Sequence, residues 1–316
     1  MASWIHKSRE IGWTAVVAAP DGLYGVSVLA PKLPTDRPQV AGCGFVAGGR
    51  LDGESLMNLA KSIAAPGCAW SVVLDREAYR ILVVAEPPVK ADEIDQSVRW
   101  SISSMVDFPV DDADIAWLKI PAHPSQAGRA PHLYVVAASH ANIETCTTAF
   151  KQARIPLQAI DIHETAQRNM ATLAERADEG VALLSLGTQG VQLTVSFQGE
   201  LYLDRWVKET LFGASVDDHA RERASERVVL QVQRSLDFVS RTMPFIDLNR
   251  VVLAPLPSDY GLRKHFIENL PVPVEDFDLA TVFDLAKTPE LVRPQNQSGY
   301  FAALGAALRF MSKSKP

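Results

Sequence analysis

The sequence predicts a two-domain α/β protein, and three observations support this fold class. Its 316 residues exceed the usual size of one domain and suggest about two. Stretches with strand and helix patterns alternate along the chain. Each half opens with a three-stranded meander, at residues 13–47 and 181–205. We therefore expect a first domain at 1–177 and a second at 178–316, separated by the polar break at 176–180.

The first meander is indicated by a tight turn between two apolar strands. Strands at 13–19 and 23–29 flank Pro20-Asp21-Gly22, where Asp-Gly supplies the backbone angles of a hairpin. A third strand is expected at 39–47 and a helix at 51–64, before the Pro-Gly pair that follows.

The rest of the first half contains one helix with a marked apolar stripe. Ile94, Val98, Ile102 and Met105 recur at helical spacing, which predicts that they are buried together. Trp100 falls off this stripe, either in a second packing layer or as an exposed anchor. The other elements expected in this half are strands at 71–74, 80–84, 114–120, 133–138 and 157–160 and helices at about 146–153 and 162–173.

The second half begins with an apolar strand that runs into Gly187-Thr188-Gln189-Gly190. An alternating strand at 191–197 and a third at 201–205 complete the meander. Apolar residues spaced three and four apart predict a long helix at about 217–242. Beyond it we expect strands at 250–254 and 272–274, a helix at 262–269 and a final helix at 301–311.

Composition excludes several functional classes. The net charge of −6 argues against nucleic acid as a partner. No apolar run reaches the roughly 18 residues that a membrane span needs, and the first seven residues lack the design of a signal peptide. The three cysteines and the scattered histidines have no metal-ligand spacing, so no metal site is expected. These features predict a cytoplasmic protein without direct membrane insertion.

An ordered set of short segments carries a family resemblance. They are Glu86-Pro87-Pro88-Val89, Ser97-Val98-Arg99-Trp100, Asp161-Ile162-His163-Glu164-Thr165-Ala166-Gln167-Arg168-Asn169, Leu201-Tyr202-Leu203-Asp204-Arg205, Gln231-Val232-Gln233-Arg234-Ser235-Leu236-Asp237 and Leu304-Gly305-Ala306-Ala307-Leu308. With the two meanders, the chain resembles the actin-like ATPase superfamily. Within it, the chain is similar to the PilM group of type IV pilus assembly proteins, and most to the MshI branch of mannose-sensitive haemagglutinin (MSHA) pili.

The resemblance implies a specific architecture and a nucleotide site. The fold would be the actin-like (ribonuclease H-like) one, with an inserted α+β subdomain at about 80–160, ordered strand-helix-strand-strand-helix-strand. ATP and magnesium would lie between the two domains. There Glu164 would orient an attacking water, and Ser185, Gly187, Thr188 and Gln189 would form the second phosphate loop.

Several positions depart from the pattern of that nucleotide site. Ser185 stands where the family has a metal-ordering carboxylate, and no lysine follows Asp21 in the first phosphate loop. Pro255 and Pro257 replace the glycines of the adenine loop, and proline lacks an amide donor. The sequence therefore predicts weak or vestigial binding of ATP and magnesium, with little or no ATPase activity.

The resemblance also implies a partner. PilM-type proteins hold the N-terminal cytoplasmic peptide of a single-span inner-membrane protein of the PilN kind, in a groove beside the inserted subdomain. We expect Arg99 and Trp100 to contact that peptide, and the chain to be peripheral to the bacterial inner membrane through it.

Three functional hypotheses follow. The first is a non-catalytic scaffold of a type IV, MSHA-like pilus assembly complex. The second is an active actin-like ATPase or small-molecule kinase. The third is a filament-forming protein that self-associates through actin-like contacts.

Overall fold

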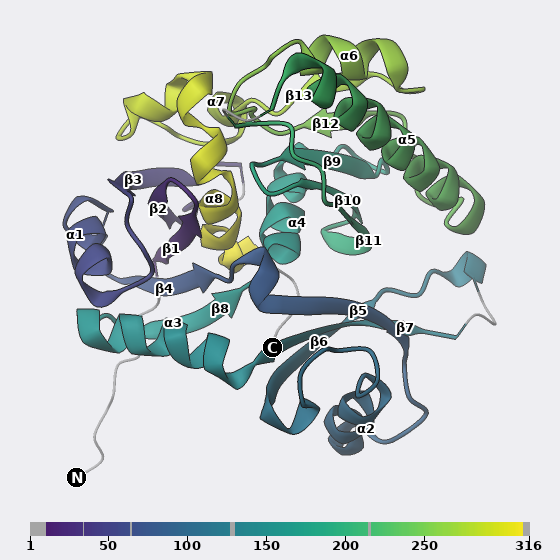
Figure 1. The fold of residues 1–316 in the computed structure, drawn as a ribbon, viewed down its shortest axis with the longest axis horizontal. Coiled ribbons are helices and arrows are strands. Elements are labelled where there is room, and N and C mark those ends of the chain that lie inside the picture. The colour runs from purple at the N-terminus through teal and green to yellow at the C-terminus, as the bar shows by residue number, and fades with distance from the viewer. Residues whose placement is uncertain (1–10, 34, 64, 127–129, 214–215, 312–316) are drawn as a thin grey trace.

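The computed structural model describes residues 11–33, 35–63, 65–126, 130–213 and 216–311. The N-terminal segment, on which the absence of a signal peptide was judged, lies outside these residues. Figure 1 shows two sheets separated by a pair of helices, with a smaller third sheet below them. The two five-stranded sheets, both of mixed strand direction, confirm the predicted α/β fold class.

The first sheet has the strand order β3-β2-β1-β4-β8. The β1–β2–β3 meander is antiparallel, whereas β4 and β8 run parallel to β1. Apolar side chains from one face of the sheet pack against helices α1 and α3. The bounds are β1 Gly12–Ala19, β2 Gly22–Leu29, β3 Gln39–Ala47, α1 Gly53–Ile63, β4 Cys68–Val73, α3 His140–Ala153 and β8 Leu157–Asp161.

The second sheet repeats this topology in the order β11-β10-β9-β12-β13. Its meander is antiparallel, and β12 and β13 are parallel to β9. Helices α5 and α6 cover one face and bury the second apolar core. The bounds are β9 Val181–Leu186, β10 Val191–Phe197, β11 Glu200–Val207, α5 Asp218–Thr242, β12 Val251–Leu253, α6 Leu262–Asn269 and β13 Val274–Asp276.

Two helices lie side by side between the sheets. They are α4, His163–Ala174, which links the halves, and α8, Phe301–Ala307, near the C-terminus (Figure 1). Gly305 permits their close approach, since a Cβ there would lie 2.1 Å from the Ala166 carbonyl oxygen. A short helix α7, Leu279–Val282, packs in the same core, which joins side chains from both sheets.

The inserted subdomain is smaller than the sequence predicts. It contains an antiparallel sheet in the order β5-β7-β6, with helix α2 packed on one face. The expected last strand, β8, instead pairs in parallel with β4, and α3 packs against α1 of the first half. A short apolar strand carries no signal of which sheet it joins, so the limit near 160 was wrong. The bounds are β5 Tyr79–Ala85, α2 Ile94–Ser101, β6 Ala113–Ile120 and β7 His132–Ser139.

Helix α2 ends earlier than its apolar stripe suggests. Ile94, Val98 and Ile102 are buried against the subdomain sheet, as predicted. Met105 is 48% exposed, because the helix stops at Ser101 and helical spacing no longer places Met105 on the buried face. Trp100 is 82% exposed, so of its two readings the exposed one is correct.

Candidate functional site

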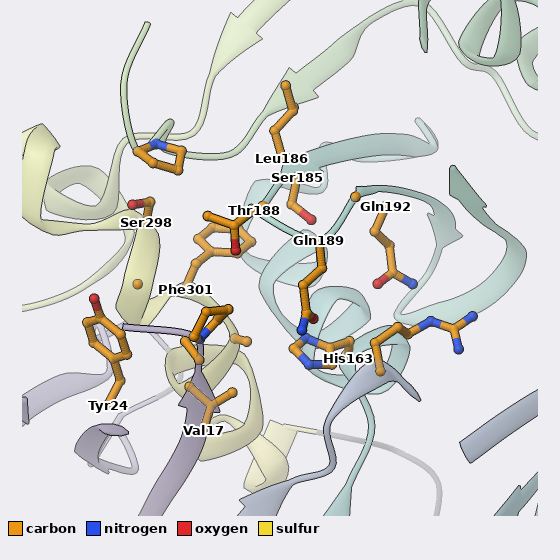
Figure 2. A pocket seen from close by; sticks show the side chains of 18 of the residues that line it. Val17, Tyr24, His163, Ser185, Leu186, Thr188, Gln189, Gln192, Ser298 and Phe301 are labelled. Atoms are coloured by element: carbon orange, nitrogen blue, oxygen red, sulfur yellow. The ribbon is translucent and has the colours of Figure 1, made fainter. Parts of the chain in front are cut away.

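A cavity of about 310 Å³ lies between the two halves. The β1–β2 turn, the β9–β10 turn and the start of α8 line it, together with Pro257 beyond β12. Figure 2 shows Tyr24, Ser298 and Phe301 on one side and His163, Gln189 and Gln192 on the other. The structure thus brings the two predicted phosphate loops together at one cleft.

In the β1–β2 turn, the carboxylate of Asp21 is engaged within the turn itself. The Tyr24 hydroxyl donates to Asp21 Oδ2 over 2.5 Å. Burial and this hydrogen bond raise the pKa of Tyr24 above its usual range. The Tyr24 ring lies so close to Gly299 that a Cβ there would be 2.4 Å from it. An aromatic ring therefore closes this side of the cleft against the start of α8.

Near the end of β9, Ser185 binds the linking helix. Its hydroxyl donates to Gln167 Oε1 over 2.5 Å. Gln167 is buried, and its Nε2 donates to the Leu183 carbonyl at 2.7 Å and to Thr194 Oγ1 at 3.1 Å. Ser185 is therefore part of a network that joins α4 to the second sheet.

The predicted phosphate-loop residues after Ser185 line the cavity, but one of their amides is already bonded. The Gly187 amide donates to the Gly190 carbonyl at 2.8 Å, within the turn. Thr188 and Gln189 are exposed to the cavity. The Trp206 ring covers the other end of the turn, since a Cβ on Gly190 would lie 2.5 Å from it.

Glu164, the predicted catalytic residue, is fully buried in the first turn of α4. Its Oε1 lies 3.2 Å from Arg76 Nε, and its Oε2 accepts from the Tyr79 hydroxyl at 2.6 Å. Arg76 and His163 line the cavity, whereas Glu164 is not among the described residues that do. Both carboxylate oxygens face the inserted subdomain and the segment that leads into it.

A second carboxylate, that of the partly buried Asp204, lies near this ion pair. Burial raises the pKa of Asp204 to about 7, with a smaller contribution from repulsion by Glu164. Gln192 Nε2 donates to Asp204 Oδ1 at 2.7 Å. Burial also lowers the pKa of His163 below its usual value.

Sequence reasoning missed several residues of the cleft. They come from loops and strand ends without a periodic pattern, where only the fold brings them together. The Arg76 guanidinium stacks over the rings of Tyr79 and Trp206, at 5.0 and 5.4 Å from their centroids. Gln167 lay within a quoted family segment, but no sequence signal indicated its hydrogen bonds.

Arg99 and Trp100 lie apart from the cleft, on the inserted subdomain. They share a shallow hollow on the outer side of α2. Arg99 Nη1 donates to the carbonyls of Val110 and, at 3.0 Å, of Ala113. The Trp100 side chain projects to solvent.

Two features are absent from the described residues. No group of three or more His, Cys, Asp or Glu in that part of the chain is placed to hold a metal ion. No helix in the same residues has the length and apolar character of a membrane span.

The two mixed sheets, the linking helix and the small antiparallel insert define the α/β actin-like ATPase fold. The structure described as "PilM-PilN type IV pilus biogenesis complex" superposes with a TM-score of 0.75 and 16% identity. That match covers 95% of this chain and 99% of the other.

Two further solved structures are similar to this chain to a lesser degree. The cytoplasmic domain of EpsL, an inner-membrane component of the type II secretion system of Vibrio cholerae, has a TM-score of 0.52 and 14% identity, with 96% of each chain covered. A Bacteroides thetaiotaomicron protein with an actin-like ATPase fold has a TM-score of 0.48 and 10% identity, with 92% of this chain and 100% of that one covered. No protein-family model and no curated protein matches the chain.

Proposed function

We propose that this chain is a cytoplasmic scaffold of a type IV pilus assembly complex of the MSHA kind. It is held at the inner membrane by the N-terminal cytoplasmic peptide of a single-span, PilN-like partner. The observation that carries the proposal is the structural similarity to the PilM–PilN complex, which extends over almost the full length of this chain and of the matched chain. The similarity to a cytoplasmic domain of an inner-membrane secretion component gives independent support.

The residues of the cleft support a degenerate nucleotide site. A triphosphate needs a metal, a lysine or free backbone amides to offset its charge. Of the described residues that line the cavity, Arg76 is already paired with Glu164, and burial lowers the pKa of His163, which disfavours its charged form. The other charged lining residues are Asp21 and Asp75, which repel phosphate. This set does not fit ATP and magnesium, so we assign no catalytic step to Glu164.

The scaffold hypothesis is tested by direct binding. Fluorescence anisotropy with the labelled N-terminal peptide of the neighbouring single-span membrane protein should show saturable binding to the full chain. We place the contacts on the inserted subdomain, with Trp100 as the anchor and Arg99 as the residue that holds the adjoining loop. Absence of binding to the wild-type chain would reject the scaffold proposal.

The ATPase or kinase hypothesis remains the second candidate, because Thr188 and Gln189 face a cavity in the expected place. Calorimetry with magnesium-ATP distinguishes the two. A micromolar affinity, equivalent to about −8 kcal/mol, would favour an active nucleotide site. Filament formation, the third hypothesis, would appear as ATP-dependent sedimentation of the chain.

A further inference from the structure

The outer side of α2 presents a cluster of apolar side chains to solvent. Trp100 lines a hollow together with Val89, Val110, Glu93 and Asp111. We call this surface the Trp100 hollow. Grouped exposed apolar residues mark interaction sites, and tryptophan is among the residues that most often anchor them.

The walls of the Trp100 hollow are fixed by hydrogen bonds. Arg99 donates to the backbone carbonyls of Val110 and Ala113 and so ties the helix to the loop before β6. On the other side, the Lys90 amide donates to Glu93 Oε2 at 3.4 Å. A partner would therefore meet a surface that is already ordered, which lowers the entropic cost of binding.

Acidic residues predominate in the segment that contains this hollow, and Glu93 and Asp111 line it. Residues 86–114 contain eight carboxylates, against only Lys90 and Arg99 as cations. Four of the carboxylates are occupied by Lys119, Trp117, Arg80 and His140. Asp92, Asp111 and Asp112 are exposed and form no ion pair with any described residue. The Arg99 guanidinium is directed at carbonyl oxygens, so it neutralises none of these three.

We propose that the Trp100 hollow binds a basic peptide segment with interspersed apolar residues, the apolar side chains against Trp100 and the cations against the acidic rim. Opposite charges at the rim would steer association and set the preference for a basic partner. The assignment of this segment to the membrane partner rests on the function proposed above. Cytoplasmic segments next to a membrane span carry an excess of lysine and arginine, which matches this surface.

The test uses the full chain and two labelled synthetic peptides of about a dozen residues. One alternates Lys or Arg with Leu or Phe, and the other has glutamate at every basic position. By fluorescence anisotropy, the basic peptide should bind and the acidic one should not. Trp100→Ala should weaken binding by about thirtyfold, the usual cost of removing a buried aromatic anchor.

Two further variants separate charge from hydrophobic contact. The double variant Asp111→Asn, Asp112→Asn should lower the affinity for the basic peptide by about fivefold and reduce the salt dependence of that affinity. Met57→Ala, which removes an exposed apolar side chain from the distant helix α1, should change nothing. Equal binding of both peptides, or unchanged binding by a folded Trp100→Ala chain, would overturn the inference.

A third arm uses the native peptide of the neighbouring membrane protein. If it binds wild type and Trp100→Ala equally, the scaffold function stands and the Trp100 hollow is not its site. If the synthetic basic peptide binds at Trp100 but the native peptide does not bind at all, the hollow stands and the scaffold function fails.

Discussion

In the cleft, Asp21 and Ser185 bond to neighbouring side chains, whereas Asp111 and Asp112 at the Trp100 hollow are exposed to solvent. Asp21 accepts from Tyr24, and Ser185 donates to Gln167. Asp111 and Asp112, beside Trp100, have no such partners among the described residues. The same chain thus contains a cleft in which several polar groups are bonded within the protein, and a surface on which two carboxylates are left for another molecule.

This difference bears on how the fold is used. In an active nucleotide site, charged groups remain available until the ligand and its metal arrive. Here Arg76, which lines the cleft, forms an ion pair with the buried Glu164. The contacts stabilise the arrangement of the two halves and the insert without a ligand. We expect changes in the cleft to alter folding stability, and changes at the Trp100 hollow to alter binding.

The largest expected effect comes from breaking the buried ion pair. Arg76→Ala leaves the fully buried Glu164 carboxylate without a cation, which typically costs about 3 to 5 kcal/mol. Urea unfolding followed by tryptophan fluorescence measures this loss. Glu164→Gln should cost less, because the amide oxygen still accepts from Tyr79 and Arg76 retains some access to solvent.

The double variant checks that the loss comes from the uncompensated charge. Arg76→Ala with Glu164→Gln should be more stable than Arg76→Ala alone, since no unpaired charge then remains buried. If the losses of stability in the two single variants simply add in the double variant, Arg76 and Glu164 are not coupled, and their ion pair does not stabilise the cleft.

A smaller effect is expected from the hydrogen-bond network of Gln167. Gln167→Leu roughly keeps the side-chain volume but removes the hydrogen-bond partner of the Ser185 hydroxyl and of the Leu183 carbonyl. We therefore expect the free energy of unfolding to fall by about 2 kcal/mol. Ser185→Ala, which removes a single hydrogen bond of a partly exposed residue, should lose about 1 kcal/mol. Differential scanning calorimetry measures both, and a Gln167→Leu chain as stable as wild type would contradict the role of the network.

Much of the fold was predictable because local patterns determine it. The hairpin turn at Asp21-Gly22 and the alternation at 191–197 specified β1, β2 and β10 closely. The 3.6-residue period specified α5. The extent of the insert was not predictable, because β8 joins the first sheet through a pairing that no nearby residue encodes.

The candidate site was predictable only in part. The residues after Ser185 lie on a turn whose sequence is distinctive, and they do line the cleft. Arg76 and Tyr79 come from a different segment, and their contact with Glu164 depends on the fold of the whole first half. Nothing in the neighbouring sequence of Glu164 indicated that both of its oxygens would be occupied.

Asp204 provides a pH-dependent test of the same cleft. Because its pKa is raised to about 7 in the folded chain, the folded state holds a proton that the unfolded state releases near pH 4. Its contribution to stability is therefore complete below pH 4 and is lost as the pH rises towards 7. Asp204→Asn keeps an acceptor for Gln192, and its stability should not fall as the pH rises because the side chain has no proton to lose.

Urea unfolding of both chains at pH 5 and pH 8 measures the effect. The stability of Asp204→Asn relative to wild type should increase by about 1 kcal/mol between these pH values. The full pKa shift would correspond to about 1.36 kcal/mol for each pKa unit. We expect a smaller change because solvent screens the partly exposed Asp204 side chain. A relative stability that does not change with pH would show that Asp204 titrates as an ordinary carboxyl.

The smallest effect on stability is expected at the Trp100 hollow. Trp100 contributes little to the core, so Trp100→Ala should change the free energy of unfolding by less than about 0.5 kcal/mol. Ile102→Ala, a fully buried position just beyond the same helix, is the matched control and should lose about 2 to 5 kcal/mol. Thermal unfolding of the two variants in parallel makes the measurement. If Trp100→Ala loses as much as Ile102→Ala, Trp100 is a structural residue, and any loss of peptide binding in that variant would reflect unfolding. If its stability is unchanged, a loss of peptide binding can be assigned to the missing indole ring at the surface.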